Sequence, residues 1–532
     1  LAIISENRTE WIITDLACVL SGFINVPIYT TLSPESIKYI LNDSKSIACF
    51  VSNKLQLEKV LKVQSELPDL KYIISYNDLK IRYLDNSIVS FSDIMKEKQK
   101  FNRKKLIVKI EEILKKADEE DLVTIIYTSG TTGVPKGVML TQKNLYSNII
   151  SCMNTLPITE KDVFLSYLPY SHIFERTAGY YLAFFSGSKI YFAQSIDTIG
   201  IQMQEVKPTM VITVPRLLDK MYNRLMKSGD EMPNGYKKKL FLFALYYAKT
   251  NGKNKSSVRW KLLDKLVYNK IREKTGGRLR FFVSGGGALN RTIGEFFDAI
   301  GIMTLEGYGM TETSPVVSVN LPEFLYYGSV GRPLSGNEVK LAEDGEILVK
   351  GDLVMKGYYN NPEDTETAIV DGWMHTGDLG MWNELGNLMI TDRKKSLFKS
   401  SGGKYIAPAH IEDLVLQLPY IDQVLVIGDS RMYVTALIVP EFNELCLVAK
   451  KIGADVSVES ELLTNQEILK KIESDLNEIQ KDLATHEKIR RFTLLNKPFA
   501  IDEGELTPTL KIKRKFVEEK YKDVIELMYH KV

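Results

Sequence analysis

Short apolar runs alternate with amphipathic stretches through the first two thirds of the chain. The runs are typical of buried strands, whereas the stretches repeat apolar residues at helical spacing. We predict strands at 163–168, 189–193, 210–214 and 279–284. We predict helices at 141–154, 215–226 and 290–300, with Thr141 capping the first and Pro215 in the first turn of the second. The alternation predicts an α/β fold with largely parallel sheets.

The texture of the chain changes after residue 344. Short predicted strands at 346–350 and 387–391 are separated by tight turns, and a charged cluster follows at 392–395. Beyond it we predict a helix at 408–416, strands at 424–428 and 433–440, and a long helix near 466–483. This predicts a large N-terminal domain, 1–391, and a small C-terminal α+β domain, 392–532. Because the chain opens inside a predicted strand without Met, we expect the large domain to lack its extreme N-terminus.

Composition narrows the class of protein. A chain of 532 residues with 44% hydrophobic and 26% charged residues is typical of a soluble protein with two or more domains. The net charge of +2 gives no electrostatic basis for nucleic-acid binding. Four widely spaced cysteines argue against a disulfide framework or a zinc site and favour a reducing, cytoplasmic compartment. No apolar run reaches the ~20 residues of a membrane span.

One segment, 237–255, reads KKKLFLFALYYAKTNGKNK, with basic ends around an apolar centre. One interpretation is a helix on a membrane surface, which would place the protein peripherally on the inner face of the membrane. The other is a partly buried helix with solvated ends, and the pattern alone favours it. The sequence leaves both membrane contact and oligomerisation open.

The strongest chemical pattern is the segment 127–141, YTSGTTGVPKGVMLT. Apolar runs on both sides predict a strand, a loop and a second strand. Glycines let backbone N–H groups approach an anion closely, and the hydroxyls and a mobile lysine add donors and charge. The candidate residues are Thr128, Ser129, Gly130, Thr131, Thr132, Gly133 and Lys136. The spacing differs from the standard nucleotide loop, and a solvated Gly/Thr hairpin is the alternative, but we predict a loop that holds a polyphosphate.

Three further segments offer nucleotide-binding chemistry. In 306–313, Tyr308 offers a flat face to a base, Thr311 a hydroxyl near the α-phosphate, and Glu312 a hard oxygen ligand for Mg²⁺. In 371–379, Asp378 on a Thr-Gly turn can accept hydrogen bonds from both ribose hydroxyls. In 284–289, glycines would let an adenine ring approach the backbone. A polar loop, a common turn and a tight strand–helix turn are the respective structural alternatives.

In order along the chain, these segments resemble the signatures of the adenylate-forming (AMP-binding) enzymes, which include acyl-CoA synthetases, luciferases and peptide-synthetase adenylation domains. The resemblance extends from 5–11 to Lys511. It implies an acetyl-CoA synthetase-like fold with a large α/β domain and a small mobile cap. It also implies ATP and coenzyme A as substrates, with Mg²⁺ on Thr128 and Glu312. The AMP contacts that it implies include the hairpin residues above, Gly286, Gly287, Glu306, Gly307, Tyr308, Gly309, Thr311 and Asp378.

The resemblance assigns further roles. Segment 169–176, PYSHIFER, is similar to the family's aromatic gate, and His172 is assigned to substrate positioning. The cluster at 392–396 resembles the interdomain hinge, although Ser396 replaces the acidic residue usual there. The resemblance implies that Arg393 contacts the ribose, that Lys395 is the pivot of the hinge, and that Lys399 makes a further contact with AMP. It also implies a coenzyme A channel lined by Ser401, Gly402 and Gly403.

The last signature is LTPTLKIKR at 506–514. Lys511 would hold the carboxylate and α-phosphate oxygens together as they react. The alternative is a basic C-terminal patch, because Lys513, Arg514 and Lys515 are also cationic. The catalytic set implied by the resemblance is therefore Lys511, Thr311, Glu312 and His172.

The implied reaction has two steps. A carboxylate attacks the α-phosphate of ATP to give an acyl-adenylate and pyrophosphate, and the thiol of coenzyme A then displaces AMP. An insertion at 217–278, together with TPTLKIKR, resembles bacterial-type long-chain acyl-CoA synthetases and implies fatty acids as substrates. Two alternatives stay open: an enzyme of the same fold that delivers the acyl group to a carrier protein, and a non-catalytic nucleotide-binding relative. Intact Lys511 and Glu312 argue against the second.

Overall fold

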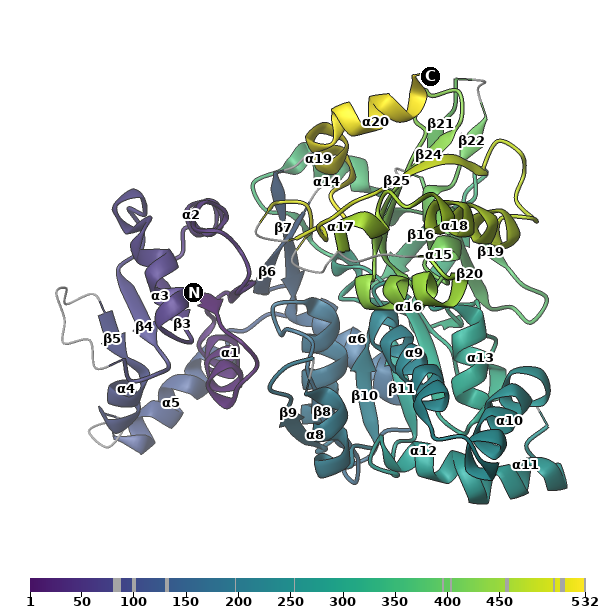
Figure 1. Ribbon diagram of the computed structural model, residues 1–532. Helices are drawn as coiled ribbons and strands as arrows, with labels where there is room; N and C mark the ends of the chain where they lie inside the picture. The colour runs from purple at the N-terminus through teal and green to yellow at the C-terminus, as the bar shows by residue number, and fades with distance from the viewer. Residues whose placement is uncertain are drawn as a thin grey trace. The chain divides into compact units, whose positions relative to one another are not determined.

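The computed structural model of the protein (Figure 1) describes residues 1–532 except 80–87, 98–101, 130–133, 197, 253, 395–396, 402–403, 455–458, 501–502, 508–511 and 531–532. At 97, 129, 230, 405, 459 and 460 it describes the backbone only. The chain divides into a larger unit (Leu1–Glu343, Ile347–Thr376 and Met381–Met389) and a smaller unit (Asp344–Glu346, Gly377–Gly380 and Ile390–Val532). The continuous part of the smaller unit thus begins at Ile390, two residues before the predicted boundary at residue 392.

A parallel sheet forms the N-terminal part of the larger unit. Its strands are β1 (Ala2–Ile4), β2 (Val26–Ile28), β3 (Ala48–Val51), β4 (Tyr72–Ser75) and β5 (Ile88–Ser90), in the order β2-β1-β3-β4-β5. The helices of this part are α1 (Thr9–Ser21), α2 (Pro34–Asp43), α3 (Lys54–Leu61), α4 (Phe91–Glu97) and α5 (Arg103–Leu114). Ala2, Ile3 and Ile4 are all buried, as expected of a parallel strand covered on both faces.

A second, antiparallel sheet carries the predicted phosphate loop. It consists of β6 (Leu122–Ser129), β7 (Pro135–Thr141) and β17 (Gly357–Tyr358), in the order β17-β7-β6. The strand–loop–strand prediction for 127–141 is confirmed for the two strands, whereas residues 130–133 of the loop lie outside the described residues.

The third sheet of the larger unit has seven strands. They are β8 (Val163–Ser166), β9 (Lys189–Phe192), β10 (Met210–Thr213), β11 (Phe281–Ser284), β12 (Met303–Gly309), β13 (Val316–Val319) and β14 (Arg332–Pro333), in the order β14-β13-β12-β11-β10-β8-β9. The run from β9 to β12 is parallel, whereas β13 is antiparallel to β12 and β14 is antiparallel to β13. The four strands predicted from the apolar runs and the largely parallel sheet are confirmed.

The helices around this sheet begin where the sequence predicts. Thr141 caps α6 (Gln142–Thr155) in a capping box with Asn144, and Pro215 occupies the first turn of α9 (Pro215–Glu231), which runs past the predicted end at residue 226. Asn290 caps α13 (Arg291–Ala299). The other helices are α7 (Leu182–Phe185), α8 (Ile199–Val206), α10 (Tyr236–Asn251), α11 (Val258–Leu263) and α12 (Asn269–Glu273), with π-helical turns η3 (Glu175–Tyr181) and η4 (Asp264–Tyr268).

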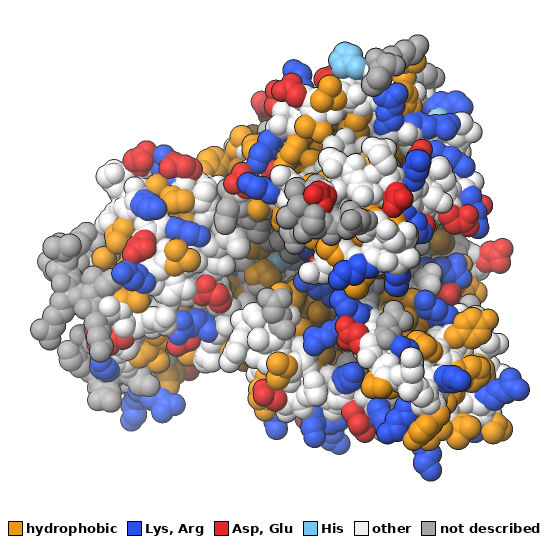
Figure 2. Space-filling view, in the orientation of Figure 1, with side chains coloured by type: hydrophobic (Ala, Val, Ile, Leu, Met, Phe, Trp, Pro, Cys, Tyr) orange, Lys and Arg blue, Asp and Glu red, His pale blue; other side chains and the backbone are white. Residues whose placement is uncertain are grey.

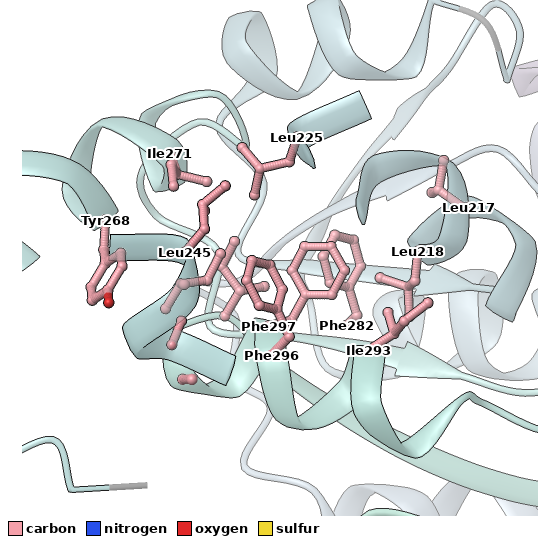
Figure 3. Close-up of a cluster of buried hydrophobic side chains, with 14 of the residues drawn as sticks. Leu217, Leu218, Leu225, Leu245, Tyr268, Ile271, Phe282, Ile293, Phe296 and Phe297 are labelled. Atoms are coloured by element: carbon pink, nitrogen blue, oxygen red, sulfur yellow. The ribbon is translucent and has the colours of Figure 1, made fainter. Parts of the chain in front are cut away.

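Aromatic side chains fill the core between the sheet and α9, α10 and α13. Figure 3 shows Phe282, Phe296 and Phe297 together at its centre, and the rings of Phe296 and Phe297 meet edge to face with centroids 5.7 Å apart. Helix α10 contributes Ala244, Leu245 and Ala248 to this core, and much of its opposite face is exposed. The basic segment that begins at residue 237 is therefore a partly buried helix, as its pattern favours.

The remaining elements complete the two units. A fourth sheet contains β15 (Asn337–Leu341), β16 (Glu346–Gly351), β18 (Ile369–Val370), β19 (Trp373–Trp382) and β20 (Leu388–Arg393), and α14 (Pro362–Ala368) precedes β18. The smaller unit contains β21 (Phe398–Lys399), β22 (Tyr405–Ile406), β23 (Ile421–Ile427), β24 (Val434–Pro440) and β25 (Ile489–Leu494). Its helices are α15 (Pro408–Val415), α16 (Phe442–Ile452), α17 (Glu459–Leu462), α18 (Gln466–Ile479), α19 (Arg514–Lys520) and α20 (Lys522–Tyr529).

The smaller unit is of the α+β class that the sequence predicts. Strand β24 is its centre, antiparallel to β23 and parallel to β25. Every residue of β24 is buried, and helices α15, α16 and α18 supply apolar partners such as Ile411, Leu445 and Ile472. No helix in the described part of either unit is both long and apolar enough to cross a membrane.

Candidate active site

The β6–β7 hairpin places two candidate ligands side by side. Its register pairs Thr128 directly with Lys136, so both side chains lie on one face of the hairpin. Strand β17 then pairs with β7, with Gly357 opposite Met139 and Tyr358 opposite Val138. A segment far along the chain is therefore brought against the phosphate hairpin by backbone hydrogen bonds.

Side chains link this hairpin to the predicted Mg²⁺ ligand. Lys136 Nζ lies 2.6 Å from Asp364 Oδ2 and 5.2 Å from the centre of the Tyr358 ring. The hydroxyl of Tyr358 donates a 2.9 Å hydrogen bond to Glu312 Oε1. We call Thr128, Lys136, Glu312, Tyr358 and Asp364 the hairpin cluster. Lys136, for which the sequence predicts a mobile charge, forms an ion pair with Asp364 in the structure.

Backbone geometry positions Glu312 in this cluster. It lies in η5 (Thr311–Thr313), and its carbonyl accepts a 2.8 Å hydrogen bond from the N–H of Met355. The preceding Gly309 has no room for a side chain, because a Cβ there would come 1.8 Å from the carbonyl oxygen of Pro315. The Glu312 residue is 9% exposed. Burial, followed by the Glu312 carboxylate, raises the pKa of Tyr358 well above its usual range, so this phenol stays a donor.

The donor set fits a hard divalent cation. Thr128 and Glu312 offer a hydroxyl and a carboxylate, which are oxygen ligands of the kind Mg²⁺ takes beside substrate phosphates. Among the described residues there is no group of three or more His, Cys, Asp or Glu that could hold a metal by itself. A Mg²⁺ held by Thr128 and Glu312 would complete its coordination with phosphate oxygens and water.

A second contact joins the gate segment to the glycine turn after β11. Phe174 packs so closely on Gly285 that a Cβ there would lie 2.9 Å from its ring. The neighbouring His172 accepts a 3.1 Å hydrogen bond at Nδ1 from the N–H of Phe174. Gly286 and Gly287 continue this turn towards α13, and the N–H of Leu289 donates a 2.9 Å bond to Glu306 Oε1. Glu306 is buried at the sheet end where Gly307, Tyr308 and Gly309 follow.

The gate segment also carries a buried ion pair that the sequence did not reveal. Arg176 contacts Asp15 with both side chains at 0% exposure, and it donates a 2.8 Å bond to the hydroxyl of Thr124. Tyr181 donates a 2.7 Å bond to Asp15 Oδ2. We call Asp15, Thr124, Arg176 and Tyr181 the Arg176 cluster. Burial opposes the charged form, but Asp15 and its neighbours keep the pKa of Arg176 above its ordinary value.

Beside it, Glu175 is buried and accepts a 2.5 Å hydrogen bond from the hydroxyl of Ser166. Burial raises the pKa of Glu175 to about 8, with the Ser166 bond acting in the opposite direction. Glu175 is therefore largely protonated at neutral pH.

In the smaller unit, two predicted ribose ligands are neighbours. Arg393 Nε donates a 2.7 Å bond to Asp378 Oδ1, with the Asp378 side chain 4% and the Arg393 side chain 56% exposed. The adjacent Lys394 pairs with Asp344 at 2.5 Å and Glu346 at 3.0 Å. These pairs tie the charged cluster at 392–394 to the two short segments that belong to this unit. Lys399 is exposed, and the N–H of Ser401 donates a 2.9 Å bond to the carbonyl of Arg431.

Several predicted residues lie outside the described residues. They are Gly130, Thr131, Thr132, Gly133, Lys395, Gly402, Gly403 and Lys511. For Ser129 only the backbone, paired with Pro135, is described. Arg514 is one of the cations near Lys511 that could have been the catalytic group instead. It forms hydrogen bonds of 2.7 and 2.9 Å to the two oxygens of Glu412 and a 2.6 Å bond to the carbonyl of Val426. Arg514 thus stabilises the smaller unit's own fold.

Two members of the hairpin cluster were not predicted. Tyr358 and Asp364 belong to a stretch that reads as a turn, GYYNNPEDT at 357–365. The Asn-Asn-Pro sequence correctly indicates that turn, and Asn361 caps α14 by accepting a 3.1 Å bond from the N–H of Asp364. The local sequence offers one hint of a site, the pair Tyr358-Tyr359 before the turn, but it does not show that Tyr358 contacts Glu312.

Comparison with known families gives two matches that together cover most of the chain. Residues 1–359 match the model described as AMP-binding enzyme, and residues 396–532 match that of the AMP-binding enzyme C-terminal domain.

Curated relatives align over nearly the whole chain. A long-chain-fatty-acid–CoA ligase, FadD15, from Mycobacterium bovis is 34% identical over 541 residues, which cover 99% of this chain and 88% of that protein. Long-chain-fatty-acid–CoA ligase 5 from Rattus norvegicus is 36% identical over 564 residues, with coverages of 100% and 80%.

Solved structures share the fold at lower identity. The didomain of a carboxylic acid reductase from Segniliparus rugosus, in complex with AMP, has a TM-score of 0.77 at 21% identity and covers 99% of this chain and 71% of that chain. O-succinylbenzoate coenzyme A synthetase from Bacillus subtilis, in complex with ATP and magnesium ion, has a TM-score of 0.64 at 23% identity, with coverages of 97% and 88%. The predicted fold class is confirmed by these likenesses and by the sheets above.

Proposed function

Because this chain belongs to the AMP-binding enzyme family, we propose that it is an AMP-forming long-chain fatty acid–CoA ligase. Its substrates are a fatty acid, ATP and coenzyme A. The observation that carries the proposal is the hairpin cluster, in which Tyr358 links the Thr128–Lys136 hairpin to Glu312 from a separate segment. The fatty-acid specificity is supported by curated relatives at 34% and 36% identity that are named for it.

The chemical problem of the first step is the meeting of two anions, the fatty-acid carboxylate and the triphosphate. We assign the triphosphate to the β6–β7 hairpin, where Thr128 and the backbone N–H groups donate to phosphate oxygens. Lys136 would exchange Asp364 for phosphate, because a charged phosphate oxygen accepts the same ammonium donor. Lys511 would stabilise the charge that builds on the α-phosphate oxygens during attack.

We assign one Mg²⁺ to Thr128 and Glu312. When bound, it would neutralise phosphate charge and orient the leaving pyrophosphate. The Tyr358 hydroxyl supports this role of Glu312, because its hydrogen bond fixes one carboxylate oxygen and orients the other.

The remaining assignments concern AMP, the acyl group and the thiol. Asp378 and Arg393 would bind the ribose as a pair, consistent with their 2.7 Å contact, with Lys395 and Lys399 nearby in sequence. Gly286, Gly287 and Tyr308 would flank the adenine, Gly307 and Gly309 would contact AMP beside it, and the hydroxyl of Thr311 would lie near the α-phosphate. His172 would position the acyl carboxylate. The backbone N–H of Phe174 donates to its Nδ1 and so fixes the orientation of the imidazole ring. Ser401, Gly402 and Gly403 would line the path of the thiol.

The test separates the two half-reactions. ATP–pyrophosphate exchange that depends on palmitate is expected, followed by palmitoyl-CoA formation when coenzyme A is added. A panel of fatty acids of increasing length, each assayed for AMP release, measures the preference for long chains. Lys511→Ala should abolish the exchange while sparing thioester formation from supplied palmitoyl-adenylate. Absence of palmitate-dependent exchange in the unaltered protein contradicts the proposal, and equal loss of both half-reactions contradicts the role of Lys511.

A second acceptor is a carrier protein. The carboxylic acid reductase didomain shares the fold of this chain at 21% identity, which shows the fold alone. Replacing coenzyme A by a phosphopantetheinylated carrier protein in the second half-reaction distinguishes the two acceptors. Faster transfer to the carrier at equal concentration would reassign the thiol substrate and leave the adenylation step unchanged.

Peripheral contact with a membrane is the last element of the proposal. Long-chain fatty acids partition into bilayers, and burial of each CH₂ group contributes about 0.8 kcal/mol. An enzyme that collects them benefits from residence at a bilayer surface.

A further inference from the structure

Positive charge is concentrated in one short part of the chain. Residues 236–278 contain 13 Lys and Arg but only two acidic residues, whereas the whole chain of 532 residues has a net charge of only +2. This part forms α10, α11, η4 and α12 in the larger unit. The excess of positive charge therefore belongs to one helical region and not to the protein as a whole.

The inner faces of these helices are fixed by the aromatic core. Leu263, Val267 and Ile271 are buried in the core cluster of Figure 3, and the hydroxyl of Tyr268 donates a 2.8 Å bond to the carbonyl of Ala244 on α10. These contacts determine which side chains of the region face outwards.

An apolar stripe lies on the outward side. Val258, Leu262 and Leu266 are 83%, 57% and 42% exposed. They recur at four-residue spacing, which places them along one face of α11 and η4. We call these three residues the outer stripe. On α10, Phe243 and Tyr246 are also exposed, at 50% and 65%. Aliphatic side chains this large are seldom exposed in a row without an apolar partner.

Exposed cations flank the outer stripe in sequence and on the helix. They are Arg259, Lys261, Lys265 and Lys270. Two other cations of the region have acidic partners, because Arg272 lies 2.6 Å from Asp264 and Lys255 lies 2.8 Å from Asp298. In Figure 2 the blue and orange side chains gather at the lower right, over the part of Figure 1 that carries α10 and α11.

We propose that the outward face of α10–α12 docks on an anionic lipid surface, with the outer stripe in the acyl boundary and the flanking cations at the headgroups. Basic residues beside a row of large apolar side chains are the pattern of a helix that lies in the membrane interface. A nucleic acid fits less well, because it leaves Val258, Leu262 and Leu266 exposed to a polar backbone. A second copy of this chain fits less well, because two such faces would bring like charges together.

This inference rests on the proposed function for its purpose, since an enzyme docked on a bilayer meets its fatty acid there. The docking itself is inferred only from the exposed outer stripe and the exposed cations beside it. The two can therefore fail separately.

Vesicle binding tests the proposal directly. The full chain is sedimented with vesicles of phosphatidylcholine alone or with phosphatidylglycerol added. We expect binding to the anionic vesicles only, weakening with added salt. The variant Arg259→Gln, Lys261→Gln, Lys265→Gln should lower the partition coefficient about 100-fold, since each cation near an anionic surface contributes severalfold. The variant Leu262→Ser, Leu266→Ser should lower it by about tenfold or more at unchanged charge.

A matched control removes three exposed cations from the smaller unit: Lys450→Gln, Lys451→Gln and Lys497→Gln. This control carries the same charge loss and should bind anionic vesicles within about threefold of the unaltered protein. Circular dichroism confirms that each variant folds.

Four outcomes overturn the proposal. The first is equal binding by the control and by the Arg259→Gln, Lys261→Gln, Lys265→Gln variant, which would make the attraction non-specific. The second is unchanged binding by the Leu262→Ser, Leu266→Ser variant. The third is tighter binding of a DNA duplex than of anionic vesicles. The fourth is a dimer of the unaltered protein that these substitutions dissociate while vesicle binding stays unchanged. Palmitate-dependent ATP–pyrophosphate exchange without vesicles should be equal in all variants, so its absence in the unaltered protein rejects the proposed function while the docking result stands.

Discussion

The hairpin cluster and the Arg176 cluster contain similar residue types but differ in how deeply their ion pairs are buried. In both, a cation pairs with an aspartate beside a tyrosine side chain. The Arg176 and Asp15 side chains are 0% exposed, and named partners in Thr124 and Tyr181 complete the network. In the hairpin cluster, the Lys136 side chain is 18% exposed and that of Asp364 is 41% exposed.

This difference in burial determines what each pair can do. A buried arginine with all its partners in place can lose its aspartate only at a large cost, because an unpaired buried charge is strongly destabilising. A lysine whose aspartate is open to water gains little from that ion pair and can exchange it for phosphate at small cost. We infer that the Arg176 cluster stabilises the fold and that the hairpin cluster binds substrate.

The largest effect is expected from Arg176→Met. Removal of the cation leaves Asp15 buried and unpaired, so the free energy of unfolding should fall by about 3–5 kcal/mol. Chemical denaturation followed by tryptophan fluorescence measures it, since buried Trp11 lies 5.4 Å from the Arg176 guanidinium. Arg291→Met, which breaks an exposed pair with Glu295, is the control and should cost at most about 1 kcal/mol. A similar loss in both variants would contradict the comparison. Asp15→Leu combined with Arg176→Met should recover part of the loss.

The next largest effect is expected from Lys136→Met. Fatty-acid-dependent ATP–pyrophosphate exchange should fall about 100-fold, because the variant lacks one donor that stabilises the negative charge of the phosphates in the transition state. Stability should change by at most about 1 kcal/mol, because the ion pair is partly exposed. Asp364→Asn keeps the lysine and should retain activity within about tenfold. If Lys136→Met instead unfolds the protein as Arg176→Met does, the two clusters share one structural role.

Glu312→Gln should raise the Mg²⁺ concentration for half-maximal exchange by about tenfold, as expected when a carboxylate at a metal site is neutralised. A magnesium titration of the initial exchange rate measures this. Glu363→Gln, on the exposed side of α14, is the matched control and should leave the titration unchanged. An unchanged titration in Glu312→Gln would remove Glu312 as a ligand.

The last effect appears only as a change of stability with pH and concerns Glu175, next to the Arg176 cluster. Its pKa in the folded protein is raised to about 8, from an ordinary value of 4.5. The unfolded chain therefore loses this proton first, so the contribution of Glu175 to stability is complete below pH 4.5 and declines as the pH rises towards 8. The slope is at most ~1.4 kcal/mol per pH unit.

Glu175→Gln removes this slope because the amide does not titrate. The stability of the variant relative to the unaltered protein should increase steadily from pH 5 to pH 8, as measured by denaturation at each pH. A difference that is constant across this range would show that Glu175 is ionised in the folded protein.

Local patterns predicted the fold well. The predicted cap Thr141 and the proline at the start of α9 mark real helix starts, and four apolar runs became strands of the seven-stranded sheet. Helix ends were less well predicted. Helix α9 continues to Glu231 past Gly229, whose backbone lies against Phe241 and Leu242 of α10, a tertiary contact that the local sequence does not show. The basic segment beginning at residue 237 was recognised, but its continuation into the outer stripe on α11 was not, because burial of the opposite face selects which residues are exposed.

By itself, the sequence determined the order and type of the elements and the candidate ligands Thr128, Lys136 and Glu312, because periodicity, capping and ligand chemistry are properties of short segments. Only the tertiary structure decided their partners. Tyr358 reaches Glu312 through the pairing of β17 with β7, and Arg176 finds Asp15 at a separation of 161 residues. Which strands become neighbours depends on burial summed over the whole chain, and that sum fixes whether a given cation ends as a structural ion pair or as a binding group.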